Sequence, residues 1–270
     1  MVNGKSVAFH IRDLESQKMF ATTPSEQHLQ QQEYKIKPPR DYESDLVVVL
    51  DMDECLIHSQ FLHGPGAKYA HQVRRNGALG DSSVDTFNIA LPDGELVRVH
   101  ERPFLREFLQ RVSDKYETHI FTAAMEVYAK PVLGNLDPHG TIFTHCWYRE
   151  SCNLDSNVGA YVKNLTVGWG DRLKRTVLVD NNPLSFLANP SNGILVSSFY
   201  NDAKDTTLPA VLELLDELNE EDDVRPILDS RFGLKQALDE IRNGHAGVRP
   251  HQAQLTPPQQ EQLVAVAAAS

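Results

Sequence analysis

The sequence predicts an α/β fold whose sheet is mostly parallel. Its first signal is the unbroken apolar run Leu46–Leu50, which contains three β-branched valines and is short for a helix. Such a run is typical of a strand that is buried on both faces. The second signal is that further apolar runs alternate with helical patterns along the chain. This is the order that a parallel sheet flanked by helices requires.

The composition limits the classes of protein that fit. The chain has 270 residues, of which 41% are hydrophobic, enough for one domain of about 200 residues with tails or for two small domains. The net charge of −11 argues against a protein that binds nucleic acid through phosphate contacts. No apolar run approaches the roughly 18 residues that cross a bilayer, and no signal peptide is recognisable. The three cysteines fit a reducing compartment. We therefore expect a soluble monomer in the nucleus or cytoplasm.

The N-terminal tail and the insertion after the first strand have their own patterns. Residues 1–44 are polar, with a Gln-rich stretch and two prolines, and predict a disordered tail, with a short helix near Arg12–Met19 as one option. After the loop-like segment Gln60–Ser83, the alternating runs Thr86–Leu91 and Glu95–His100 flank a Pro-Asp-Gly turn. Because Pro fixes φ and Gly accepts positive φ, these runs predict a β-hairpin inserted after the first strand.

The rest of the chain alternates helices and strands. Pro103 is expected to start a helix, because its missing N–H costs nothing in a first turn. The next predicted elements are a strand at His119–Ala123, a helix at Glu126–Leu136, a further candidate strand at Thr141–Thr144, strands at Thr176–Val179 and Ile194–Phe199, a helix around Leu208–Leu218 and a last helix at Pro226–Arg242. Residues 243–270 are low in complexity and predict a second disordered tail, which leaves 45–242 as the folded domain.

Polar side chains follow three of the buried strands. They are Asp51 and Asp53 after the first strand, Thr122 in the second, and Asp180 with Asn181 after the third, while Lys163 lies between the last two strands. The carboxyl ends of parallel strands share one edge of a sheet, so we expect these side chains to meet. Carboxylate and amide oxygens suit Mg²⁺, Thr122 can donate to a phosphoryl oxygen, and Lys163 can neutralise its charge.

The motifs around these residues resemble a known family. Asp51–Leu56, read DMDECL, resembles the DxDx[TV] nucleophile motif of the haloacid-dehalogenase (HAD) superfamily. ERPFLREFL, IFTAAMEVYAKPV, YRESC, YVKNL and VLVDNNP follow in the order of the small RNA polymerase II C-terminal-domain phosphatases, and the resemblance covers about Asp45 to Ile227. It implies a Rossmann-like parallel sheet flanked by helices, with a small β-hairpin or three-strand insertion after the first motif.

The resemblance also implies a role for each matched catalytic residue. Asp51 would be the nucleophile that forms an aspartyl-phosphate, and Asp53 would protonate the leaving oxygen and then activate water. The Asp51 carboxylate, the Asp53 carbonyl and Asn181 would bind Mg²⁺, with Asp180 acting through a water. The phosphoryl group would be held by Thr122 and Lys163. Asp53 must be protonated in the first step, so its pKa needs raising, and we expect the nearby Asp51 charge to raise it.

Three further residues are expected at the substrate groove. The resemblance implies that Met125, Tyr128 and Arg149 lie near the residues that flank the phosphoserine. The alternative is that Met125 and Tyr128 pack their helix onto the sheet. The insertion after the first motif is too small for a full cap domain, so the cleft should stay open to a protein chain.

We therefore expect an Mg²⁺-dependent phosphatase of phosphoserine or phosphothreonine proteins, acting on the polymerase C-terminal domain or similar Ser-Pro phosphopeptides. Two alternatives stay open: a catalytically weak binding module of the mitochondrial import-receptor type, and a HAD phosphatase of small metabolites. Two departures from the family pattern stand out. Cys55 replaces the usual Thr or Val and is expected to be a small buried side chain, and Gly168–Leu173 carries one inserted residue.

The cysteines suggest two other chemistries, which fit less well. A cysteine-based phosphatase needs an Arg six positions after its Cys, and none of Cys55, Cys146 and Cys152 has one. Zinc binding by Cys146, Cys152, His139 and His145 matches no closed zinc spacing, so we favour ordinary packing for these residues.

Overall fold

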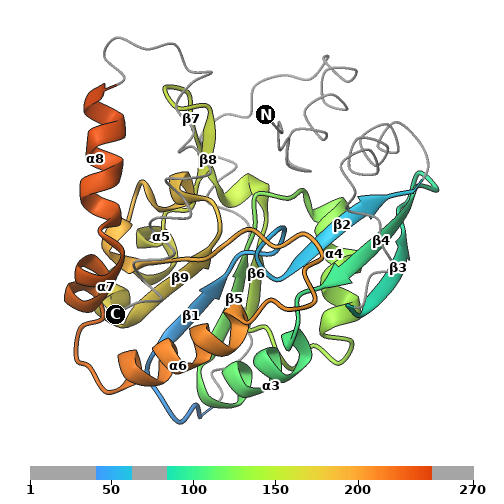
Figure 1. Cartoon of the computed structure of the whole chain (residues 1–270), viewed down its shortest axis with the longest axis horizontal. Helices are drawn as coiled ribbons and strands as arrows, with labels where there is room; N and C mark the ends of the chain where they lie inside the picture. Colours follow the sequence, from blue (N-terminus) through green and yellow to red (C-terminus); the bar gives the residue numbers. More distant parts are fainter. Residues whose placement is uncertain (1–40, 63–83, 245–270) are drawn as a thin grey trace. The chain divides into compact units, whose positions relative to one another are not determined.

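The computed structural model describes residues 41–62 and 84–244. At its centre is a five-stranded sheet in which every neighbouring pair is parallel (Figure 1). Its strands are, in spatial order, β10 (Gly193–Leu195), β9 (Thr176–Asp180), β1 (Val47–Leu50), β5 (Glu117–Phe121) and β6 (His145–Trp147). The predicted α/β class and its parallel sheet are confirmed.

The predicted first strand is the middle strand of this sheet. All four residues of β1 are fully buried, which explains why the run is apolar without interruption. Leu50 is paired with Ile120 of β5 and with Val179 of β9. The three strands therefore end at the same level, and the residues that follow them share one edge of the sheet.

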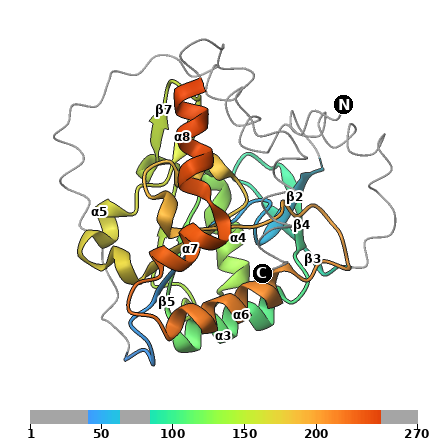
Figure 2. The same cartoon turned by 60° about the vertical axis from the view of Figure 1, so that its left-hand side comes forward.

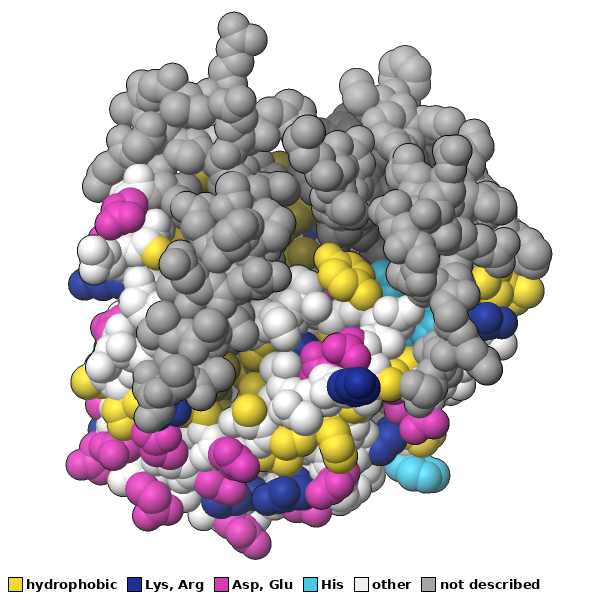
Figure 3. Space-filling view, in the orientation of Figure 1, with side chains coloured by type: hydrophobic (Ala, Val, Ile, Leu, Met, Phe, Trp, Pro, Cys, Tyr) yellow, Lys and Arg dark blue, Asp and Glu magenta, His cyan; other side chains and the backbone are white. Residues whose placement is uncertain are grey.

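Helices flank the sheet (Figures 1 and 2). They are α3 (Leu105–Lys115), α4 (Glu126–Leu136), α6 (Thr207–Asn219), α7 (Arg225–Phe232) and α8 (Leu234–Gly244). α3 and α6 lie side by side, and each buries one apolar face, as the helical spacing of their apolar residues predicts. Figure 3 shows this face with acidic and basic side chains side by side: α6 carries acidic residues, whereas α3 carries both signs of charge.

The insertion after the first motif contains a second, antiparallel sheet. Its strands are β2 (Ile57–Phe61), β4 (Leu96–Glu101) and β3 (Thr86–Ala90), with β4 in the middle. The predicted hairpin is β3–β4, and Gly94 in its turn has a φ of 83°. Gln60 and Phe61 were expected in a loop but lie in β2, because they pair with Arg98 and Val97.

Smaller elements, which the sequence patterns did not predict, fill the connections. They are the hairpin strands β7 (Asn153–Asp155) and β8 (Ala160–Val162), the short helix α5 (Thr166–Trp169), and the 3₁₀ turns η2 (Arg149–Ser151), η3 (Gly170–Arg175), η4 (Pro183–Phe186) and η5 (Pro190–Asn192). The one-residue insertion at Gly168–Leu173 lies in α5 and η3.

Two predicted elements are wrong. No strand forms at Thr141–Thr144, because the Asp137 carboxylate accepts hydrogen bonds from three backbone N–H groups of this stretch and holds it in a turn. The strand begins at His145 instead. The single helix predicted at Pro226–Arg242 is two helices, because Gly233 has a left-handed φ of 58° and ends α7 before α8 begins.

Other elements have displaced ends. The strand expected at His119–Ala123 is β5, which ends at Phe121, so Thr122 and Ala123 follow the strand. The helix expected from Pro103 begins at Leu105, since Phe104 has a left-handed backbone with a φ of 67°. Of the strand predicted at Ile194–Phe199, only the first two residues lie in β10. The chain then turns toward the loop after β1, where the last residue of that stretch donates a backbone hydrogen bond to the Glu54 carbonyl.

The predicted tails, 1–44 and 243–270, lie outside the described residues except for 41–44 and 243–244, and so does the helix considered at Arg12–Met19. Within the described residues, no helix combines the length and the apolar character that a membrane crossing requires.

Candidate active site

The loop after β1 presents Asp51 and Asp53 at the edge of the sheet. The Asp51 N–H donates to Val179 O at 2.9 Å, which continues the pairing of β1 with β9 by one residue. The loop then closes tightly, because the Met52 carbonyl accepts the N–H groups of the three residues at 55–57. Cys55 is fully buried, with Sγ 3.8 Å from Val179 O, which confirms the expected small buried side chain.

The loop after β1 is also held by Arg102. This residue belongs to the ERPF motif, and the sequence patterns indicated no role for it. It is 1% exposed, and its Nη1 donates to Cys55 O at 2.8 Å. Its Nε and Nη2 make a bidentate pair with Asp205 at 2.9 and 2.7 Å, and Nη2 also reaches Ser197 and Thr207. A planar guanidinium is suited to several fixed acceptors. Arg102 therefore ties the loop after β1 to the segment before α6.

Lys163 brings together the ends of β1 and β9. Its Nζ lies 2.5 Å from Asp51 Oδ1 and 2.6 Å from Asp180 Oδ2, and all three side chains are buried. Lys163 follows β8, and its backbone N–H is fixed by Ser185 O at 3.0 Å. The predicted meeting of these three residues is thus present in the structure.

The charges of this cluster do not balance. Burial raises the pKa of Asp51 and the Asp180 charge raises it further, although Lys163 opposes both effects. Burial alone would lower the pKa of Lys163, but the carboxylates of Asp180 and Asp51 outweigh it and raise that pKa above its usual value. One cation between two carboxylates leaves a net negative charge in a buried place, which favours binding of a further cation.

Asn181 completes a set of oxygens that fits Mg²⁺. Its amide group lies 3.2 Å from Asp51 Oδ2 and 3.3 Å from Asp53 O on one side, and 3.0 Å from Ser198 Oγ on the other. With the amide oxygen on the first side, three acceptor oxygens face one another, at a spacing close to the roughly 3 Å between neighbouring ligands of octahedral Mg²⁺. The set combines a carboxylate, a backbone carbonyl and an amide oxygen. In the described part of the chain, no three or more His, Cys, Asp and Glu side chains come together in a group that could hold a metal ion.

Asp53 is held by Tyr128, which sequence analysis assigned to substrate binding. The Tyr128 hydroxyl lies 2.5 Å from Asp53 Oδ1 and 2.6 Å from Ser59 Oγ. Burial raises the pKa of Asp53 well above its usual value and the Glu54 charge adds to this, while the Tyr128 hydrogen bond opposes it. The direction is the one that an acid catalyst needs. The Asp51 charge raises the pKa of Asp53 as expected, but burial and the Glu54 charge contribute more.

Thr122 directly follows β5, the strand that pairs with β1. Its side chain is buried, and Oγ1 accepts a hydrogen bond from Ala124 N at 3.0 Å, which leaves its hydroxyl proton to donate. The turn after Thr122 is held by Arg149, whose Nε donates to Ala123 O at 2.7 Å. Cys152 Sγ lies 3.7 Å from Thr122 O.

Tyr128 and Arg149, both expected near the substrate groove, have buried side chains. Tyr128 is 2% exposed and packs α4 onto the fold, which is the alternative considered for it, and Arg149 is 5% exposed and stacks on Tyr161 at 5.0 Å. The substrate-binding role expected for both residues is still a prediction. Met125, at the start of α4, is half-buried.

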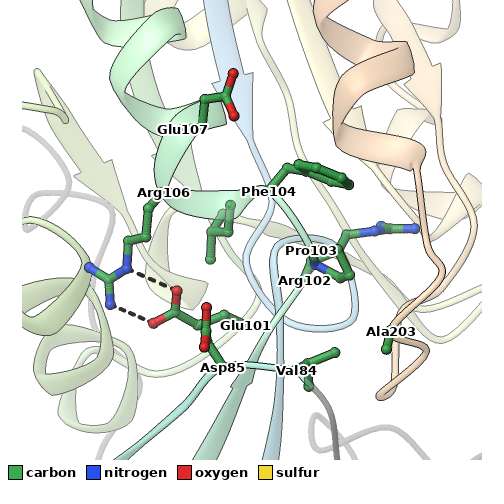
Figure 4. Close-up of a pocket in the computed structure, with 10 residues that line it drawn as sticks. Val84, Asp85, Glu101, Arg102, Pro103, Phe104, Arg106, Glu107 and Ala203 are labelled. Atoms are coloured by element: carbon green, nitrogen blue, oxygen red, sulfur yellow. Dashed lines mark hydrogen bonds and ion pairs between the residues drawn. The ribbon is translucent and has the colours of Figure 1, made fainter.

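A cavity of about 290 Å³ between β4 and α3 is separate from this site (Figure 4). Arg106 and Glu101 pair in it, while the guanidinium of Arg102 extends away toward the segment before α6. None of the predicted site residues lines it.

Comparison with known proteins then decides the family. Residues 46–225 match the model of the "NLI interacting factor-like phosphatase" family. The chain belongs to this family. It is the C-terminal-domain phosphatase branch of the HAD superfamily, as the motifs suggested.

Two curated relatives illustrate this membership. A probable C-terminal domain small phosphatase of Dictyostelium discoideum is 38% identical over 184 residues, which are 67% of this chain and 53% of that protein. The zebrafish (Danio rerio) CTD nuclear envelope phosphatase 1B is 38% identical over 184 residues, or 67% of this chain and 70% of that protein. The chain thus spans about half the length of the first relative. Among solved structures, the RNA polymerase II CTD phosphatase Fcp1 has a TM-score of 0.42 and 22% identity, covering 84% of this chain and 62% of that one.

Proposed function

We propose that this member of the NLI interacting factor-like family is an Mg²⁺-dependent phosphatase of phosphoserine or phosphothreonine proteins, with Asp51 as its nucleophile. The observation that carries the proposal is the position of Asp51 at the end of the central strand. One of its carboxylate oxygens contacts Lys163, and the other faces Asn181.

The chemistry requires two displacements at phosphorus. In the first, an Asp51 oxygen bonds to phosphorus, the bond to the serine oxygen breaks, and Asp53 gives its proton to that oxygen. In the second, Asp53 takes a proton from water, the water oxygen bonds to phosphorus, and the bond to Asp51 breaks to release phosphate. A bound Mg²⁺, held by Asp51, the Asp53 carbonyl and Asn181, would supply positive charge for the phosphoryl oxygens.

The remaining residues hold the phosphoryl group and the reacting carboxylates. Lys163 offers its charge beside Asp51, and the Thr122 hydroxyl can donate to a phosphoryl oxygen. Asp180 shares Lys163 with Asp51, so its role would be to orient that lysine as well as to support the metal site. Tyr128 and Arg149 would support Asp53 and the turn after Thr122.

The proposed substrates are Ser-Pro phosphopeptides, such as repeats of the polymerase C-terminal domain. Support comes from relatives that are named C-terminal-domain phosphatases. The described part of the insertion is a three-stranded sheet, which suits a cleft that stays open. We propose the nucleus or cytoplasm as the location, and a monomer.

The test is hydrolysis by the purified chain, with and without EDTA and added Mg²⁺. We expect EDTA to stop the hydrolysis of p-nitrophenyl phosphate and Mg²⁺ to restore it, and Ser-Pro phosphopeptides to have a higher kcat/KM than sugar phosphates or nucleotides. Preference for a metabolite would favour the small-molecule phosphatase instead. Peptide binding without turnover would favour the binding module.

A further inference from the structure

Ser198 lies behind the proposed metal site, on the side of Asn181 that faces away from Asp51. Its Oγ is 3.0 Å from the Asn181 amide. Backbone hydrogen bonds fix its position on both sides: Val196 N donates to Asp180 O at 3.0 Å, and Phe199 N donates to Glu54 O at 2.8 Å. Ser198 is therefore held between the loops that follow β9 and β1.

The Asn181 amide can satisfy these neighbours in two ways, which have opposite consequences for a metal. In one orientation its nitrogen donates to Ser198 Oγ, and its oxygen faces Asp51 Oδ2 and Asp53 O. In the reverse orientation its oxygen accepts from Ser198, and its nitrogen donates to the two site oxygens. Only the first orientation presents an oxygen to a cation, whereas the second fills the same place with an N–H group.

The proton of Ser198 decides between the two orientations. If the hydroxyl donates to Asn181, the amide oxygen is turned away from the site. If the hydroxyl accepts from Asn181, its own proton is given to another acceptor, either water, since Ser198 is exposed, or a neighbouring side chain. The Tyr200 hydroxyl is hydrogen-bonded to Ser198 and can be that acceptor. The Tyr200 ring is half exposed and its position is fixed by an edge contact with His58, at 5.2 Å between ring centroids.

We propose that Ser198, together with Tyr200, is a positioning element that keeps the Asn181 amide oxygen turned toward the metal site. Neither side chain is placed in the set of oxygens that would bind the ion. The role is the one that second-layer partners play in metal sites, where they orient a ligand that they do not replace. This inference rests on the proposed function, since it requires that Asn181 binds Mg²⁺.

The experiment measures Mg²⁺ binding to the full chain by isothermal titration calorimetry, without substrate. Ser198→Ala removes the group that accepts from Asn181, and we expect the Kd for Mg²⁺ to rise about tenfold, the low end for such partners. Ser198→Thr keeps a hydroxyl and should restore binding. Tyr200→Phe removes only the second hydroxyl and should raise the Kd several-fold. The matched control is Tyr42→Phe, which removes a tyrosine hydroxyl bonded to another hydroxyl, Thr144 Oγ1 at 2.8 Å, and should leave the Kd unchanged.

A kinetic measurement separates positioning from damage to the fold. With p-nitrophenyl phosphate, Ser198→Ala should need more Mg²⁺ for half-maximal rate but recover most of kcat at saturating Mg²⁺. A Kd equal to that of the wild type in Ser198→Ala overturns the inference and leaves the proposed function intact. If Ser198→Ala does not fold, Tyr200→Phe decides, and an unchanged Kd there overturns the inference. A wild-type chain that binds no Mg²⁺ overturns the proposed function as well.

Discussion

At the scale of single residues, the site depends on how a few buried charges share their partners. Lys163 lies between Asp51 and Asp180, and Tyr128 lies between Asp53 and Ser59. Each contact gives its carboxylate a distinct environment. Asp51 has a cation beside it, whereas Asp53 has a neutral hydroxyl and the charge of Glu54. The geometry thus suits one carboxylate to attack and the other to carry a proton.

The first prediction concerns Asp51→Asn. Turnover should fall by several orders of magnitude, on the scale seen when a covalent nucleophile is removed. Folding raises the pKa of Asp51, so the folded protein binds that proton more tightly than the unfolded chain does. Ionisation of Asp51 at pH 7 therefore lowers the free energy of unfolding. The Tm of the variant in EDTA should therefore equal or exceed that of the wild type. A clear drop in Tm, or more than about a tenth of the activity remaining, would count against the assignment.

The second prediction concerns Tyr128→Phe, which removes the hydroxyl that contacts Asp53 and keeps the ring that packs α4. A serine alkoxide needs its proton far more than p-nitrophenolate does, and general acids contribute about 10²–10⁴-fold. We expect kcat/KM, which reports the first displacement, to fall about tenfold or more for phosphoserine peptides and much less for p-nitrophenyl phosphate. Equal losses on the two substrates would show that the hydroxyl does not act through Asp53.

At the scale of elements, the loop between β1 and β2 is the part that other segments must hold. Its end is fixed by Arg102, which follows β4, and through this arginine by Asp205 just before α6. The small antiparallel sheet therefore positions Arg102, the arginine that supports the loop after β1. The loop also contains Glu54, whose φ of 56° is unusual for a residue other than glycine.

The third prediction concerns Arg102→Met. The substitution leaves the half-buried Asp205 carboxylate and the Cys55 carbonyl without this donor, and removing one partner of such a buried pair costs about 3–5 kcal/mol. The free energy of unfolding in urea should fall accordingly. The matched control is Arg111→Met, whose exposed pair with Glu107 at 4.0 Å should matter by less than about 1 kcal/mol. Equal costs for the two substitutions would contradict the role given to Arg102.

At the scale of the whole molecule, the sheet and its helices form a core within 41–62 and 84–244. The domain limits read from the sequence, 45–242, are still a prediction. The two terminal segments had no core-forming pattern, and their role is still a prediction.

The fourth prediction is that a chain without residues 1–40 and 245–270 keeps the Tm and the Mg²⁺-dependent activity on p-nitrophenyl phosphate. The reason is that the described core is built from residues between 46 and 238, a range that contains every proposed site residue. Circular dichroism and the hydrolysis rate would check this. A shortened chain that is insoluble or has lost its helices would show that a terminal segment belongs to the fold.

Much of this arrangement could be predicted because it depends on local patterns. The apolar run at Leu46–Leu50 predicted the central strand, and the acids after it and at the end of β9 predicted the shared edge. Contacts between distant segments could not be predicted in the same way. Tyr128 meets Asp53 from 75 positions away, and Arg102 meets Asp205 from 103 positions away. The residues near each of these side chains in the sequence do not indicate such a contact. A tyrosine that is buried on an apolar helix face has the same sequence spacing as one that lies beside a substrate groove.

Local hydrogen bonds explain the other differences. Thr141–Thr144 has the apolar content of a strand, but one carboxylate, Asp137, takes its N–H groups. Gly233 sits in a run with helical spacing and still ends a helix, because its left-handed backbone closes the last turn. In both places a single residue overrides the pattern of its neighbours.

The central claim, that Asp51 carries the phosphoryl group, is tested most directly by trapping that intermediate. The wild-type chain is mixed with Mg²⁺ and a phosphoserine peptide, quenched during turnover, and treated with borohydride, which reduces an acyl phosphate to an alcohol. Peptide mass spectrometry should then find homoserine at position 51 and at no other carboxylate, and none in the sample without substrate. Homoserine at a different position, or turnover with no reduced residue at all, would contradict the account.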